Sequence, residues 1–125
     1  MKTEELNTEH SKLSAAALIT VPAFAGTRDG VRHFFGTRHR PDDAASWTTS
    51  KRQIVVSVKQ VHGTDALILD RPVAEGETFA GVCDALVTDQ TGVLLTVRTA
   101  DCVPVLVHDP VQRVVAAIHA GWRGA

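Results

Sequence analysis

The 125-residue sequence has only two cysteines, one methionine, no tyrosine and a formal net charge of −1. Two cysteines, Cys83 and Cys102, are too few for the disulfide framework of a small secreted domain, so we expect a reduced, cytoplasmic chain. The small net charge gives no general attraction to nucleic acid or to an anionic membrane. No apolar run approaches the ~20 residues that a membrane-spanning helix needs. The absences favour one ordinary domain with neither a membrane nor a nucleic-acid partner.

Two local features leave alternatives open. An apolar run over residues 13–25 ends in Ala23-Phe24-Ala25, a pattern that signal peptidase cleaves, although the acidic flank before it is atypical of a secretory signal. Residues 28–52 carry six basic and three acidic side chains, which is a local excess that could bind RNA or another anion. No aromatic residues are interleaved with those charges in the way that nucleic-acid binding surfaces favour.

The hydrophobic pattern predicts short strands separated by turns that contain glycine and proline. A strand–turn–strand hairpin is expected over residues 18–35, after a polar tail at residues 1–17. Further strands are expected at residues 54–58, 66–69, 93–97, 103–107 and 114–118, with loops at 40–52 and 70–81. The last three strands are nearly free of charge and are expected to be buried. The turn Asp109-Pro110-Val111-Gln112 is typical of a tight connection between antiparallel neighbours.

Three reactive side chains lie at predicted strand ends, namely His62, Cys102 and His119. Side chains at the ends of different strands can converge on one cleft. Two imidazoles and a thiolate are good ligands for Zn²⁺, and three protein ligands leave a fourth position open. The alternative is that these are ordinary polar residues, because separations of 40 and 17 residues match no short metal motif.

The chain resembles the YfiH-type family over most of residues 31–125. The resemblance is carried by the segments His33-Phe34-Phe35-Gly36-Thr37-Arg38, Gln60-Val61-His62-Gly63, Asp84-Ala85-Leu86-Val87-Thr88 and Gly92 to Gly124, which contains TADC and HAGWRG. This family has been labelled laccase-domain or multicopper polyphenol oxidase, and its members are described as zinc-dependent purine nucleoside enzymes. The resemblance implies that the QVHG histidine, the TADC cysteine and the HAGW histidine bind the metal, here His62, Cys102 and His119.

The same resemblance implies an α+β fold, in which a mixed, mainly antiparallel sheet belongs to an α/β/β/α sandwich. Residues 18–125 would then form the N-terminal portion of the domain, incomplete at its C-terminus. The chain stops shortly after its most apolar strand, which also indicates a fragment of a longer protein. A non-catalytic piece, one completed by a partner chain or homo-oligomer, or one that needs the absent C-terminal half, is therefore the alternative to an active enzyme.

The resemblance implies phosphorolysis of purine nucleosides, including methylthioadenosine, and deamination of adenosine. The expected partners are thus purine nucleosides and phosphate. Phosphorolysis needs guanidinium groups that hold phosphate beside the sugar, and Arg38 and Arg123 are the candidates for this catalytic role. For substrate binding or ligand orientation the candidates are Gln60, Asp101 and Trp122. Solvated arginines and a purely packing tryptophan are the alternatives.

Counting histidines tests the older copper label. The six histidines include no His-x-His pair, so the several coppers of a multicopper oxidase do not fit. One copper held by two histidines and a cysteine remains an alternative to zinc, although the usual weak axial thioether is missing, because the only methionine is Met1. We expect Cys83 to take no part in metal binding.

Overall fold

The structure is a computed structural model that describes residues 18–22, 24, 31–37 and 53–124. The chain divides into two compact units, Met1–Ser46 and Trp47–Ala125. The predicted tail at residues 1–17 and the predicted loop at 40–52 lie entirely outside the described residues. Among the described residues, none forms a helix long and apolar enough to cross a membrane.

The first unit contains the predicted hairpin. Strand β1 (Leu18–Ile19) pairs antiparallel with β2 (Phe35–Gly36). The Nε2 atom of His33 accepts a hydrogen bond of 2.7 Å from the Val21 amide. This bond gives His33 a structural role in the hairpin.

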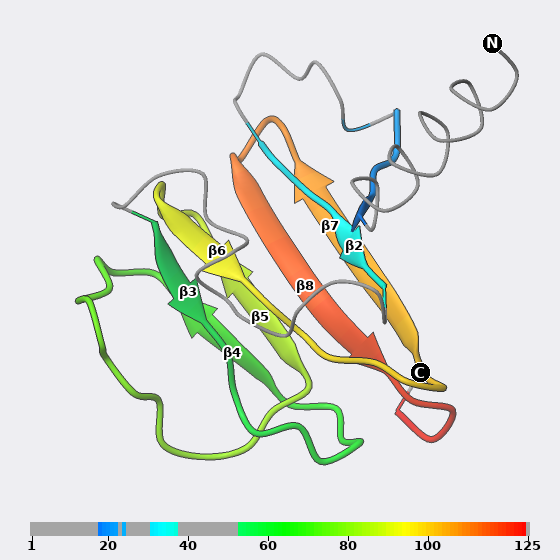
Figure 1. Cartoon of the computed structure of the whole chain (residues 1–125). Coiled ribbons are helices and arrows are strands. Elements are labelled where there is room, and N and C mark those ends of the chain that lie inside the picture. Colours follow the sequence, from blue (N-terminus) through cyan, green and yellow to red (C-terminus); the bar gives the residue numbers. More distant parts are fainter. Residues whose placement is uncertain (1–17, 23, 25–30, 38–52, 125) are drawn as a thin grey trace, which may run out of the picture. The chain divides into compact units, whose positions relative to one another are not determined.

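The second unit contains a parallel strand pair and a four-stranded sheet (Figure 1). Strands β3 (Ile54–Val56) and β6 (Val93–Leu95) form the parallel pair. The sheet has the order β4 (Ala66–Leu69), β5 (Ala85–Thr88), β8 (Val114–Ala120) and β7 (Val103–Asp109). Its β4–β5 pair is parallel, and both pairs that involve β8 are antiparallel. The predicted mixed pairing is confirmed, whereas the residues that the structure describes include no helix of the predicted sandwich.

The turn between β7 and β8 forms as its sequence predicts. The Asp109 side chain accepts hydrogen bonds from the backbone amides of Val111 and Gln112, at 2.9 and 3.0 Å. Such bonds from an aspartate to the amides that follow stabilise a tight reversal. The two long strands that leave this turn run antiparallel, with Asp109 opposite Val114.

The core of the second unit lies between its two groups of strands. Its buried residues are Val56, Leu69, Val73, Cys83 and Leu86. Of the three strands expected to be buried, β8 lies inside the sheet, but β7 ends the strand order in the described part of the chain. Val103 and Val107 on β7 are 60% and 48% exposed, so the prediction of burial was wrong for that strand. An uncharged sequence indicates an apolar environment for a strand but does not distinguish an inner position from an outer one.

Candidate metal centre

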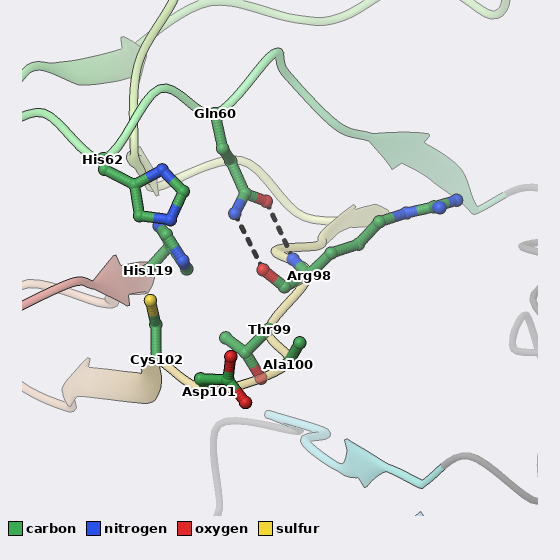
Figure 2. A pocket seen from close by; sticks show the side chains of 8 residues that line it. All are labelled: Gln60, His62, Arg98, Thr99, Ala100, Asp101, Cys102 and His119. Carbon is green, nitrogen blue, oxygen red and sulfur yellow. Dashed lines mark hydrogen bonds between the residues drawn. The ribbon is translucent and has the colours of Figure 1, made fainter.

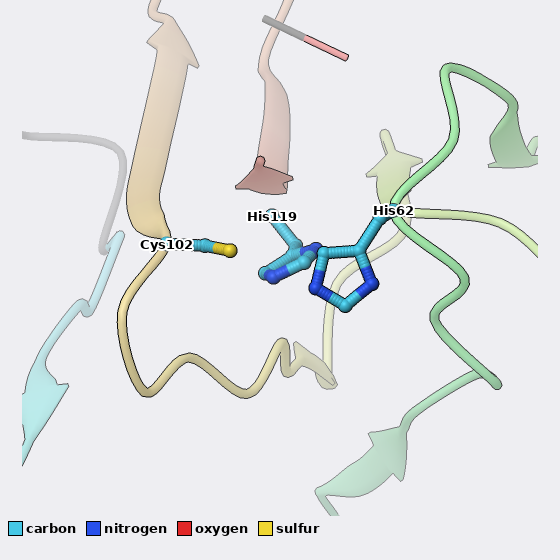
Figure 3. A group of neighbouring side chains, drawn as sticks. All are labelled: His62, Cys102 and His119. Atoms are coloured by element: carbon cyan, nitrogen blue, oxygen red, sulfur yellow. The ribbon is translucent and has the colours of Figure 1, made fainter. Parts of the chain in front are cut away.

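Three donor side chains meet at one end of the second unit (Figure 3). One ligand atom from each of His62, Cys102 and His119 lies within 4.8 Å of the others. His119 is buried, Cys102 half-buried and His62 exposed. The group therefore opens toward solvent on the His62 side.

The three donors reach this point from different elements. Cys102 directly precedes β7, and His119 is the penultimate residue of β8, where it lies opposite Pro104. Antiparallel pairing thus places the N-terminal end of β7 beside the C-terminal end of β8. His62 is not at a strand end as predicted, because β3 already ends at Val56 and His62 lies in the loop before β4.

Two glycines let the turn after β8 pack against the donors. A Cβ atom on Gly121 would lie 3.3 Å from the Cδ2 atom of His62 and 3.7 Å from the Cys102 sulfur. A Cβ atom on Gly124 would lie only 2.7 Å from the carbonyl oxygen of Gly63. A side chain at Gly121 would press on the His62 ring, and one at Gly124 would press on the Gly63 backbone.

Trp122 and Arg123 project from this turn into solvent. The Trp122 side chain is 83% exposed, and the Arg123 guanidinium carbon lies 4.8 Å from the centre of its ring. Together with His62 and Gly121 they line a hollow of about 280 Å³. The predicted arginine and the predicted aromatic residue therefore lie next to a donor histidine.

A second hollow, of about 350 Å³, is also lined by His62. Its lining consists of Gln60, His62, Arg98, Thr99, Ala100, Asp101, Cys102 and His119 (Figure 2). The Gln60 side chain donates to the Arg98 carbonyl and accepts from the Arg98 amide, both at 2.8 Å. Both ends of its amide are thus engaged in holding the segment that leads to Cys102.

The other predicted site residues have different positions. Asp101 is exposed and lines the second hollow beside Cys102. The Arg98 side chain points away from the donors. Arg38 lies outside the described residues. Cys83 is buried in the core cluster and is not a member of the donor group.

Asp84, for which no role was predicted, has more hydrogen-bond partners at this site than any predicted site residue. Its carboxylate is 2% exposed and accepts hydrogen bonds from the amides of residues 61–63 and from the His119 ring. Burial raises the pKa of Asp84. The hydrogen bonds that its carboxylate accepts, from Val61, Gly63, His119 and His62, outweigh this effect and lower the pKa to about 2. The carboxyl group is therefore ionised at neutral pH. The sequence feature that could have identified Asp84 is its position as a charged residue directly before the apolar segment 85–87.

A family model described as multi-copper polyphenol oxidoreductase laccase matches residues 36–125. The chain belongs to this laccase-domain family. A relative in Streptomyces coelicolor, named purine nucleoside phosphorylase, is 50% identical over 70 residues, which is 56% of this chain and 28% of the relative. A protein named adenosine deaminase RL5, from an unknown prokaryotic organism, is 37% identical over 75 residues, which is 56% of this chain and 29% of that protein.

Among solved structures, YlmD from Geobacillus stearothermophilus resembles this laccase-domain chain with a TM-score of 0.51 and 35% sequence identity. The similarity covers 64% of this chain and 32% of YlmD. The chain thus spans less than a third of the length of the relatives it matches. Over residues 36–125 the family is established.

The donor set fits one ion of a borderline-soft metal. Two imidazoles and a thiol suit zinc or copper, and bond lengths of about 2.0–2.3 Å place zinc ligand atoms roughly 3.3–3.6 Å apart. The largest separation here exceeds that spacing by about 1 Å. Within residues 18–22, 24, 31–37 and 53–124, this is the one such group, so the several coppers of the family's descriptive name do not fit the described site.

Proposed function

We propose that His62, Cys102 and His119 bind one divalent ion, and that this ion is zinc. The proposal is carried by the convergence of two imidazoles and a thiol within 4.8 Å. Copper is the alternative that the family description suggests. A thiol ligand must be reduced, which a cytoplasmic location would provide.

We further infer that the site serves phosphorolysis of purine nucleosides, methylthioadenosine included, together with deamination of adenosine. The names of two relatives, a purine nucleoside phosphorylase and an adenosine deaminase, support this reaction class. Because the matches span less than a third of those proteins, the proposal includes further lining of the pocket by a second chain, by a homo-oligomer partner or by additional residues.

The described side chains have separate tasks in the proposed reaction. When bound, a zinc ion acts as a Lewis acid and lowers the pKa of a water molecule toward neutrality. The exposed Arg123 donates hydrogen bonds to phosphate, and the open face of Trp122 stacks on the purine. In phosphorolysis the bond between the base and C1′ breaks as a phosphate oxygen bonds to C1′. Asp101 lies where it could orient a ligand in the second hollow, and Arg38 stays a predicted phosphate contact.

Product analysis tests this function. Zinc-loaded protein is incubated with adenosine in the presence and absence of phosphate, and the products are separated by chromatography. We expect adenine and ribose 1-phosphate only with phosphate, and inosine in both conditions. Soluble, zinc-loaded protein that forms neither product would contradict the proposal and favour a non-catalytic or partner-dependent chain.

A further inference from the structure

The two carboxylate oxygens of Asp84 have different partners. Oδ1 accepts hydrogen bonds from the amides of Val61 and Gly63, both at 3.0 Å. Oδ2 accepts from the His62 amide at 2.9 Å and lies 2.7 Å from the Nδ1 atom of His119. A single oxygen atom therefore bridges the two residues that carry the imidazole donors.

All acceptor positions of this carboxylate are engaged. An ionised carboxylate offers about four lone-pair positions, and Asp84 has four donors around it. Its side chain is 2% exposed. Asp84 thus has no acceptor left for an ion or a substrate, and any effect on the site must pass through the two histidines.

The contact with His119 fixes which ring nitrogen faces Asp84. A carboxylate oxygen can only accept, so the Nδ1 atom of His119 donates to Asp84, and Nε2 is the ring nitrogen left to face a ligand. The His119 amide also donates to the Asp84 carbonyl at 2.7 Å. Both the ring and the backbone of His119 are therefore held by Asp84.

The contact with the loop fixes the second histidine. His62 has a φ of 61°, in the left-handed region that residues other than glycine rarely adopt. Three successive amides, from Val61 to Gly63, converge on the carboxylate in this conformation. Without that anion the loop has no equivalent acceptor in the described contacts, so the direction of the His62 ring depends on Asp84.

We propose that Asp84 is a positioning residue that presents the Nε2 atom of His119 and the ring of His62 to one divalent ion. The inference rests on the metal site proposed above and adds a residue that does not touch the metal. Partners of this kind, which orient a ligand from behind, typically change metal affinity 10- to 100-fold.

The Asp84→Asn variant removes one acceptor oxygen with little change in volume. The new side-chain amide can place its NH₂ group at the position of either oxygen. The NH₂ group then faces either the amides of Val61 and Gly63 or the His62 amide and the His119 ring, and those groups lose their acceptor. Co²⁺ is the probe, because its absorption reports both affinity and the bond to a thiolate. We expect at least tenfold weaker Co²⁺ binding and a weaker thiolate-to-cobalt band. Asp89→Asn is the matched control, since Asp89 is exposed and follows β5 as Asp84 precedes it.

The possible results separate the two proposals. Equal Co²⁺ affinity and equal spectra for Asp84→Asn and Asp89→Asn would overturn the positioning role while leaving the metal site intact. Failure of the unaltered chain to bind Co²⁺ would overturn the metal site, and the positioning role with it.

A second measurement needs no variant and therefore does not depend on whether Asp84→Asn folds. Nitrogen-15 NMR of the unaltered, metal-free chain distinguishes the two neutral forms of a histidine ring. We expect the His119 proton on Nδ1. A neutral ring with its proton on Nε2 would overturn the proposal.

Discussion

Asp84 and His119 are joined by two hydrogen bonds of 2.7 Å, one between their side chains and one from the His119 amide to the Asp84 carbonyl. Both residues are buried, at 2% and 5% exposure. The pair connects the residue before β5 with the penultimate residue of β8. The same contact thus belongs to the sheet and to the donor group. Losing it should therefore lower both the unfolding free energy and the affinity for metal, and each can be measured separately.

Acid should weaken the fold through Asp84. Burial raises the pKa of its carboxyl group, but hydrogen bonds from three amides and the His119 ring outweigh that effect and hold the pKa at about 2, below the ordinary value of 3.8. Because the folded pKa is the lower one, the stabilisation is present above about pH 4 and is lost as the pH falls toward 2. Between about pH 6 and pH 2, we expect the metal-free chain to lose roughly 2 kcal/mol more unfolding free energy than Asp84→Asn. Urea titrations that give both proteins the same pH dependence would contradict this.

The two cysteines should differ in their effect on metal content. Cys102 belongs to the donor group, whereas Cys83 is buried in the apolar core. We expect Cys102→Ser to lose most of the bound zinc and Cys83→Ser to retain it. Elemental analysis of the purified proteins gives the ratio directly, and equal losses from both variants would defeat the assignment of the thiol ligand.

A methyl group at Gly124 should displace the turn that carries Trp122 and Arg123. Its Cβ atom would lie 2.7 Å from the Gly63 carbonyl oxygen, a backbone atom that cannot rotate away. We expect Gly124→Ala to lower the unfolding free energy by about 1–3 kcal/mol and to reduce activity by lowering affinity for phosphate. Thermal unfolding and phosphate titrations measure the two effects. Gly36→Ala is the control, because nothing lies within 4 Å of its Cβ position.

Removing the Gln60 amide should loosen the segment that leads to Cys102. Gln60→Ala eliminates both hydrogen bonds to the Arg98 backbone. We expect metal affinity to fall several-fold, with a weaker thiolate-to-cobalt band, because the position of the sulfur becomes less restricted. Gln112→Ala, in the exposed turn after β7, should leave both unchanged. If Gln60→Ala binds Co²⁺ as the control does, Gln60 has no part in positioning Cys102.

The sequence predicted where strands form better than it predicted which strands lie side by side. The hairpin, the strand over residues 66–69 and the antiparallel pair around Asp109 all form. No bounds were predicted for strand β5. The exposure of β7 depends on which strand lies beside it, and that information is not local to the sequence.

Residue chemistry and family resemblance both pointed to His62, Cys102 and His119, and the structure brings these three together. Asp84 was missed as a site residue because its importance comes from partners 21–35 residues away along the chain. A buried carboxylate is recognisable only when its surroundings are known. For Gln60 the sequence suggested a role near the site, and the coordinates add that its amide faces the Arg98 backbone.

The donors are spread widely along the chain, with a sequence separation of 40 from His62 to Cys102 and of 17 from Cys102 to His119. A single bound ion would therefore act as a cross-link that closes two chain loops at once. Closure of this kind reduces the conformational entropy of the unfolded chain, and a preformed site rarely exists in that state. With the proposed ion bound, metal occupancy and folding would be linked in this unit, and a chelator would then act on it as a denaturant does.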